Sequence, residues 1–225
     1  MFGAFRTTFV ITAAVLTLGG AEALATERAG VAKKVQSDAF QSRIGIGFPV
    51  AANDEVFRQS RVYTQEYGTM DVLLDDGTSL TVAPNSSLTI DDYVYAGNQA
   101  SGSLSISLAK GALRFVSGRM SSDSYGVKTT VATIGVRGTT FWLNDLADGK
   151  LEVWTQDGVV TASPVESDRV FTFQAPAYAV CSATTCEQGE APPVPATFPL
   201  DPTEGGSFEG RGDKESEFSE SGGDF

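Results

Sequence analysis

Carboxylates are the side chains of this sequence that could carry acid–base chemistry. The 225-residue chain contains no histidine, which removes serine–histidine and cysteine–histidine designs and most zinc sites. Neighbouring residues on a strand point to opposite faces, so an adjacent acidic pair does not form a two-carboxylate active site by itself. Three such pairs lie in the globular part, at Asp54-Glu55, Asp75-Asp76 and Asp91-Asp92. We therefore predict that the protein is not an enzyme and has no catalytic residue, cofactor or metal.

A serine and a lysine are spaced as S-x-x-K at Ser107 and Lys110. On a helix this spacing would place both side chains on one face, but on a strand it places them on opposite faces. The partner motifs S-D-N and K-T-G are missing from the sequence. A serine–lysine dyad is therefore not expected.

The most unusual segment is T-V-A-T-I-G-V-R-G-T-T-F-W-L at 130–143. In it Arg137 lies between two glycines, Gly135 and Gly138, and Thr139 follows the second glycine. Glycine is depleted in strands, and two glycines in four residues favour a bulge. Large apolar residues occupy both alternating faces, so we expect the bulge to switch the inward face midway. Arginine is seldom buried unpaired, and we predict that Arg137 is a buried structural clamp. The alternative is an arginine that receives an anionic ligand.

Four aromatic residues are candidates for binding, namely Trp142, Trp154, Tyr93 and Tyr95. Each tryptophan alternates with apolar neighbours along its strand, which predicts that it lies on the face opposite to the core. Exposed aromatic rings can stack on sugars or anchor a protein partner. The alternative is that another part of the protein covers these rings.

Alternation of apolar and polar residues predicts strands throughout the globular part. The clearest case is G-S-L-S-I-S-L at 102–108, and shorter runs with the same period occur at 70–74, 80–82, 88–90 and 151–153. Many short strands with frequent turns indicate an all-β fold, a twisted β-sandwich or partly open barrel of antiparallel hairpins. A β-solenoid-like fold is the alternative, although the sequence has no fixed repeat period.

Aspartate–glycine pairs predict hairpin turns, because glycine accepts the positive φ that such turns require. These pairs are Asp76-Gly77, Asp148-Gly149 and Asp157-Gly158. We also expect Lys110-Gly111 to turn the strand at 102–108 back on itself.

The N-terminus predicts export. Residues 1–25 carry one arginine, a short apolar run and an A-x-A cleavage site, as in a secretory signal peptide. An uncleaved N-terminal anchor is the alternative. Cys181 and Cys186 are the only cysteines, and an exported protein favours a disulfide between them.

The C-terminus changes composition. Residues 191–202 contain five prolines, which favour an extended polyproline-like chain. From residue 187 onward ten acidic and two basic residues supply −8 of the net charge of −12, and such a tail is predicted to be disordered. We divide the chain into a signal peptide (1–25), an N-terminal β segment packed on the domain (26–55), a β domain (56–163), C-terminal strands with the disulfide (164–187) and a tail (188–225).

Three segments, taken in order, carry a resemblance to a known family. They are D-D-G-T-S-L-T-V-A-P-N-S-S-L-T-I-D-D-Y-V-Y at 75–95, L-A-K-G-A-L-R-F-V-S-G at 108–118 and V-K-T-T-V-A-T-I-G-V-R-G-T-T-F at 127–141. Together they resemble the FecR domain, a periplasmic β module, over about residues 56–163. The resemblance marks Asp76, Gly77, Gly111, Gly135, Arg137, Gly138 and Thr139 as signature residues with structural roles.

The resemblance also bears on function. Iron-transport regulators of this family resemble a relay with a cytoplasmic segment that binds a sigma factor, one membrane helix and this domain in the periplasm. Here a signal peptide is expected in place of the first two parts.

We therefore predict an interaction or sensing module in the envelope of a Gram-negative cell, periplasmic or secreted and not membrane-spanning after cleavage. An envelope protein or a glycan is the expected partner. The alternatives are a glycan-binding module and a purely structural surface domain. Nucleic acid is not expected to bind, because the chain is acidic.

Overall fold

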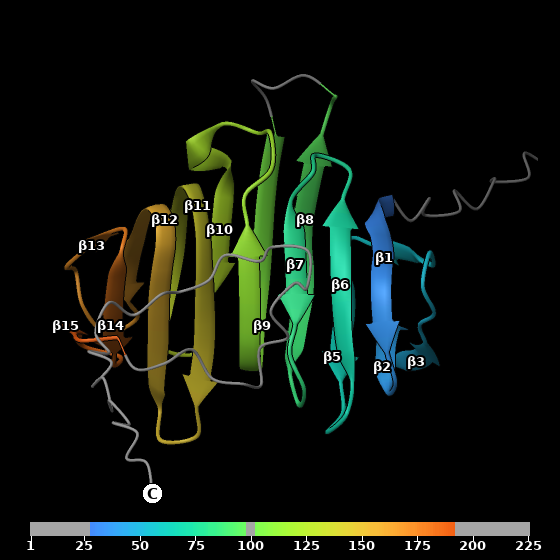
Figure 1. Ribbon diagram of the computed structural model, residues 1–225, viewed down its shortest axis with the longest axis horizontal. Coiled ribbons are helices and arrows are strands. Elements are labelled where there is room, and N and C mark those ends of the chain that lie inside the picture. Colours follow the sequence, from blue (N-terminus) through green and yellow to red (C-terminus); the bar gives the residue numbers. More distant parts are fainter. Residues whose placement is uncertain (1–27, 98–101, 192–225) are drawn as a thin grey trace, which may run out of the picture.

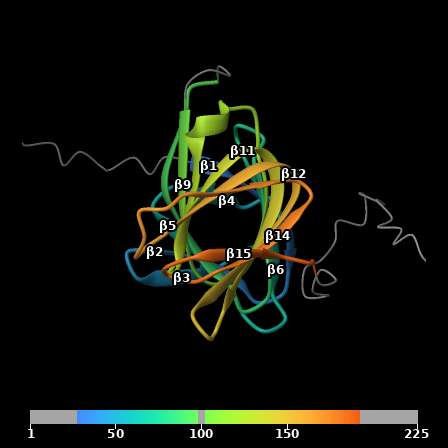
Figure 2. The same cartoon turned by 90° about the vertical axis from the view of Figure 1, so that its left-hand side faces the viewer.

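The chain folds into two facing β layers that share three long strands. The computed structural model describes residues 28–97 and 102–191. In these ranges fifteen strands join one mixed sheet, which is not closed into a barrel. Figure 1 shows the strands side by side along the long axis, and Figure 2 shows the two layers facing each other. The prediction of an all-β fold is confirmed.

Hydrogen-bonded neighbours define the two layers. The first layer contains β15 (Cys186–Gly189), β14 (Ala177–Cys181), β12 (Lys150–Pro164), β11 (Ala132–Leu146), β9 (Gly102–Val116), β7 (Ser79–Val82), β6 (Thr69–Leu74), β1 (Arg28–Gln36) and β4 (Glu55–Phe57). The second layer contains β13 (Phe171–Gln174), the other halves of β12, β11 and β9, β10 (Tyr125–Lys128), β8 (Ser87–Tyr95), β5 (Ser60–Thr64), β2 (Ala39–Arg43) and β3 (Ile46–Pro49). Among the described strands only β9 and β10 pair in parallel, whereas a β-solenoid would be built from parallel pairs.

Each of the three shared strands bends at a glycine with positive φ. These glycines are Gly111 in β9 (φ +83°), Gly138 in β11 (φ +58°) and Gly158 in β12 (φ +74°). The first half of β11 pairs with β10 and its second half with β9, so the strand passes from the second layer to the first. The bends therefore allow continuous strands to build both layers around one core.

The bend in β11 also changes which side chains reach the core. Ile134 and Val136 are buried in the core before it, and Phe141 and Leu143 are buried there after it, so the inward positions move from even to odd numbers. The register against β12 shifts between Arg137 and Thr140. The predicted bulge with a switch of the inward face is confirmed.

Two predicted turns are instead bends within strands. Asp157-Gly158 lies in the middle of β12 and Lys110-Gly111 lies inside β9, so both turn predictions are wrong. Glycine with positive φ serves a bulge as well as a hairpin, and the local sequence does not distinguish the two. The other two predicted turns are confirmed, because Asp76-Gly77 connects β6 to β7 and Asp148-Gly149 connects β11 to β12.

Large apolar side chains fill the space between the layers. Phe115 of β9 stacks on Phe141 of β11 with ring centroids 5.1 Å apart, and Phe115 also forms a T-shaped contact with Tyr125 of β10, with centroids 5.8 Å apart. All three rings are buried. The three long strands therefore contribute to both the backbone of the two layers and the aromatic centre of the core.

The predicted disulfide is confirmed: Cys181 of β14 and Cys186 of β15 are register partners and are bonded to each other. Within residues 28–97 and 102–191, no helix is long and apolar enough to cross a bilayer. The expected signal peptide and nearly all of the expected tail lie outside the described residues. The division of the chain into domains stays a prediction.

Candidate functional site

A fully buried carboxylate, Asp76, connects three segments of the domain. Its Oδ1 accepts hydrogen bonds from the Thr78 amide (3.1 Å) and the Tyr93 hydroxyl (3.3 Å). Its Oδ2 accepts hydrogen bonds from the Thr78 hydroxyl (2.6 Å) and the Tyr125 hydroxyl (2.9 Å). Burying a charge is costly unless hydrogen bonds replace its hydration, and four donors do so here. Through these hydrogen bonds Asp76 connects the turn between β6 and β7 to Tyr93 of β8 and to Tyr125 of β10.

The segment after β9 closes over the other side of this turn. Arg119 donates both its amide and its Nε to the Asp76 carbonyl oxygen, at 3.0 Å and 3.1 Å. The Gly118 amide donates to the Thr78 hydroxyl at 3.1 Å. A Cβ at Gly118 would lie 2.6 Å from Asp76 Oδ2, so this close approach requires glycine.

Burial raises the pKa of both tyrosines in this network. For Tyr93 and Tyr125 loss of hydration is the largest cause, and the negative charge of Asp76 raises the pKa further. Both phenols therefore stay protonated at neutral pH and remain donors to the carboxylate. The network therefore joins the β6–β7 turn to β8 and β10 through hydrogen bonds to one carboxylate.

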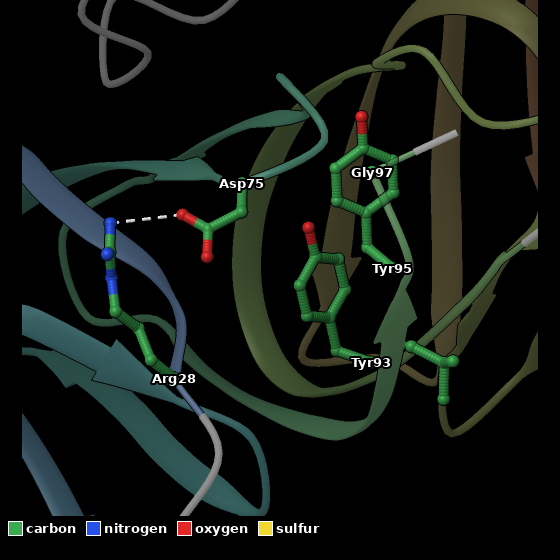
Figure 3. Close-up of a pocket in the computed structure, with 6 residues that line it drawn as sticks. Arg28, Asp75, Tyr93, Tyr95 and Gly97 are labelled. Atoms are coloured by element: carbon green, nitrogen blue, oxygen red, sulfur yellow. Dashed lines mark hydrogen bonds and ion pairs between the residues drawn. The ribbon is translucent and has the colours of Figure 1, made fainter. Parts of the chain in front are cut away.

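A pocket of about 540 Å³ opens beside the network (Figure 3). Its lining residues are Arg28, Asp75, Tyr93, Val94, Tyr95 and Gly97. An ion pair between Arg28 and Asp75 (3.0 Å) lies on one side, and the two tyrosines lie on the other. The described part of the chain has no group of three side chains that could hold a metal ion, here or elsewhere.

The pocket places the two candidate tyrosines differently. Tyr95 is half-buried at the pocket, and its binding role stays a prediction. Tyr93 is buried, and its hydroxyl is engaged with Asp76. Of the two readings of Tyr93, the structure therefore agrees with the one in which the protein covers the ring, because the side chain turns inward to the buried carboxylate.

Arg137 is exposed, and the prediction of a buried clamp is wrong. Its side chain is 64% accessible, and its Nε lies 3.4 Å from the carboxylate of Asp123. The physical reason is alternation: Ile134 and Val136 face the core before the bend, so Arg137 lies on the outer face. Val136 before it and Thr139 after it are both buried. The backbone of Thr139 makes the connection between strands instead, since its amide donates to Ser117 Oγ (2.9 Å) and its carbonyl oxygen accepts from the Ser117 amide (3.0 Å).

We expect Arg137→Ala to leave the stability almost unchanged, because an exposed ion pair contributes less than about 1 kcal/mol to the free energy of unfolding. Urea unfolding of the variant and the parent checks this. A loss of several kcal/mol would show that the guanidinium has a structural role that its exposure and its single ion pair do not reveal.

The two tryptophans lie on the outer face of the first layer, as their alternation predicts, but they are not exposed. Trp142 is 7% accessible and Trp154 is 4% accessible. They are direct register partners on β11 and β12 and form a small cluster with Ala83 and Ala112, apart from the main core. An open tryptophan face for stacking on a glycan is therefore absent from this surface.

The remaining polar candidates do not assemble into a site. Ser107 donates a hydrogen bond to Asp91 across the β8–β9 pair at 2.6 Å, and Lys110 is exposed. Asp92 lies 3.7 Å from Arg58. Asp54 accepts a hydrogen bond from the Ala51 amide at 2.7 Å, which stabilises the turn before β4. Ser107, Asp92 and Asp54 therefore each have a structural partner of their own.

A feature that the sequence analysis missed is the β2–β3 hairpin. Ile44 at its tip is 99% exposed, and Ile46 and Phe48 on β3 are also exposed. Among the described strands β3 pairs only with β2, so its outer edge is free. The signal was the run R-I-G-I-G-F at 43–48, in which apolar residues and glycines alternate with no polar face.

Comparison with known proteins identifies the domain that contains these features. Residues 60–161 match the model of a family described as FecR protein. Residues 60–161 are a FecR domain. The FecR domain runs from β5 into β12 and includes the Asp76 network and all three bends, whereas the β2–β3 hairpin lies before it.

Solved structures add a distant likeness. Two crystal structures, each described as a "putative anti-sigma factor" from Parabacteroides distasonis ATCC 8503, share 15% sequence identity with this chain, with TM-scores of 0.46 and 0.45. Both alignments cover 57% of this chain and 58% of the other chain. This chain therefore spans less than two thirds of the length of those proteins. No curated protein matches.

Proposed function

We propose that this protein is a non-enzymatic, exported FecR-domain module of the cell envelope that senses or recruits a partner protein. The β2–β3 hairpin is the contact surface, and the partner supplies an extended apolar segment that adds to β3. The observation that carries this proposal is the exposure of every residue of β3, a strand whose outer edge pairs with no other described strand. An exposed apolar edge invites strand addition, which combines backbone hydrogen bonds with side-chain contacts.

The backbone of the hairpin tip supports a functional role. Ile44 has φ +53°, in the left-handed region that β-branched residues rarely adopt. Residues with such a strained backbone occur more often at functional sites than elsewhere in proteins. A fully exposed isoleucine in that conformation contributes nothing to the core, so a partner is the reason we assign to it.

Two further observations support export and the absence of catalysis. The disulfide between Cys181 and Cys186 suits an oxidising compartment, in agreement with the predicted signal peptide. The buried carboxylate network is saturated with structural hydrogen bonds, and the pocket beside it presents an ion pair and aromatic rings rather than a nucleophile and a base. The match to the FecR family agrees with a regulatory interaction role.

Photo-cross-linking in the source cells tests the proposal. A photoreactive residue at position 46 of the full chain should give a cross-link to one partner protein, and Phe48→Asp in the same chain should abolish that cross-link. Phe48→Asp should change the stability by less than about 0.5 kcal/mol, because the side chain is exposed.

The matched control is Val170, an exposed apolar residue between β12 and β13. A photoreactive residue there should not capture the same protein. If position 46 captures nothing, or if positions 46 and 170 capture the same set of proteins, the hairpin is not a specific contact surface and a purely structural domain is the better description.

A further inference from the structure

A row of register partners crosses the outer face of the first layer. Tyr178 of β14 pairs with Trp154 of β12, Trp154 pairs with Trp142 of β11, and Trp142 pairs with Arg114 of β9. We call these four residues the aromatic ladder. The rings of Trp154 and Tyr178 lie 5.1 Å apart, and the Arg114 guanidinium lies 5.6 Å from the Trp142 ring. The ladder is therefore a row of neighbouring planar side chains that runs across the strands on one face of the layer.

The burial of the two indoles requires a cover. Both rings are more than nine-tenths buried, yet the described apolar residues around them are Ala83, Ala112 and Tyr178, which all lie in or beside the same layer. Among the described residues, neither Trp142 Nε1 nor Trp154 Nε1 has a hydrogen-bond acceptor, although both atoms are buried. A buried indole N–H almost always finds an acceptor. The part of the chain that the structure describes therefore supplies neither an apolar layer above the ladder nor acceptors for the two indole N–H groups.

The chain itself leads to this surface. Gly189 of β15 is the register partner of Tyr178, so β15 lies directly beside the Tyr178 end of the ladder. The described chain ends two residues later, at Ala191. The next residues are P-P-V-P-A-T-F-P-L-D-P at 192–202.

We propose that the proline-rich segment at 192–202 of the same chain binds across the aromatic ladder as a polyproline helix. Aromatic-lined surfaces are the usual receptors of such helices, because proline rings pack on indole and phenol faces. A polyproline helix has no internal hydrogen bonds, so its carbonyl oxygens are free to accept from the indole N–H groups of Trp142 and Trp154.

The dimensions agree with this arrangement. Crossing from β15 to β9 along the ladder covers four strand spacings, or about 19 Å at ~4.8 Å each. A polyproline helix rises about 3.1 Å per residue, so six or seven residues cover that distance. The first seven residues of the proline-rich segment, 192–198, contain three prolines, have this length and follow directly after the described end of the chain beside β15.

Hydrogen bonds from the domain fix the orientation of Tyr178, the residue at the β14 end of the ladder. Tyr178 donates its hydroxyl to Glu152 Oε1 at 2.9 Å, and Asn144 holds the other carboxylate oxygen at 2.8 Å. Tyr178 therefore presents its ring in one position. A preorganised receptor loses less entropy on binding and suits a segment that is already extended.

Tryptophan fluorescence tests the proposal directly, because Trp142 and Trp154 are the only two tryptophans of the chain. The full-length protein should have blue-shifted emission and weak quenching by acrylamide. The full-length variant with Pro192→Ser, Pro193→Ser and Pro195→Ser should show a red shift and a several-fold increase in the quenching constant. The matched control carries Phe208→Ser and Phe218→Ser further along the tail and should behave like the parent.

Circular dichroism of each variant verifies that the β domain is folded. A synthetic peptide of residues 190–203, added to the triple variant, should restore the blue-shifted emission, and its serine version should not. If the parent is already quenched strongly, or if the triple variant stays as shielded as the parent, the proposal is wrong. Shielding that disappears on dilution would place the segment on a second copy of the chain and would overturn the intramolecular assignment.

Discussion

Replacing Asp76 by alanine should lower the free energy of unfolding by about 3–5 kcal/mol. The substitution removes an acceptor that serves the Thr78 amide and the hydroxyls of Tyr93 and Tyr125. These donors are buried, and none can turn to water without opening the turn between β6 and β7. Urea unfolding at neutral pH, followed by circular dichroism, measures the loss.

The neighbouring residue gives a matched control. Asp75 is partly exposed, and its side chain pairs with Arg28 in the pocket of Figure 3. Asp75→Ala should cost less than about 1 kcal/mol, as is usual for an exposed ion pair. Equal losses for the two variants would contradict the assignment of Asp76 as the group that joins three segments of the FecR domain.

Gly158→Ala should be the second strongly destabilising substitution, by about 2–5 kcal/mol. A residue with a Cβ loses about 1–2 kcal/mol in the left-handed region, and overpacking adds about 1–3 kcal/mol. Gly158 has φ +74°, and a Cβ there would clash with the carbonyl oxygen of Gly138 on the facing bulge. Either β11 or β12 would have to move, at the point where both strands change layers.

Gly149 separates the two contributions. It has φ +76°, nearly the same as Gly158, but a Cβ there would meet no atom within 4 Å. Gly149→Ala should therefore show only the conformational cost of about 1–2 kcal/mol. Thermal unfolding of the two variants checks the difference, and identical losses would show that the two bulges do not depend on close contact at Gly158.

Local patterns predicted much of the architecture. Alternation identified strands such as β6 and the first half of β9, because the period of two follows directly from strand geometry. Large apolar residues lie at even positions before Gly135–Gly138 and at odd positions after them, and this change predicted the bulge in β11. The predicted export of the protein and the five-residue separation of its two cysteines predicted the disulfide. The FecR resemblance was recognisable because its segments lie in order along these strands.

The candidate site was less accessible to sequence analysis. Asp76 was marked as a signature residue at a turn, but its role as a buried acceptor depends on Tyr93 and Tyr125, which are 17 and 49 residues away. Nothing in the local sequence distinguishes Asp76 from the partly exposed Asp75 beside it. The exposed β2–β3 hairpin was missed because apolar residues normally predict burial.

The sequence alone determined the strands, the disulfide and the position of the bulge in β11, since these follow from periodicity, cysteine spacing and the conformational range of glycine. Only the tertiary structure decided that Asp157-Gly158 bends a strand while Asp148-Gly149 reverses one, that Arg137 faces solvent and that the tryptophans are covered. The reason is that a positive φ and an alternating face are local properties. Which strand pairs on each side, and what lies above each face, depends on partners distant in the sequence.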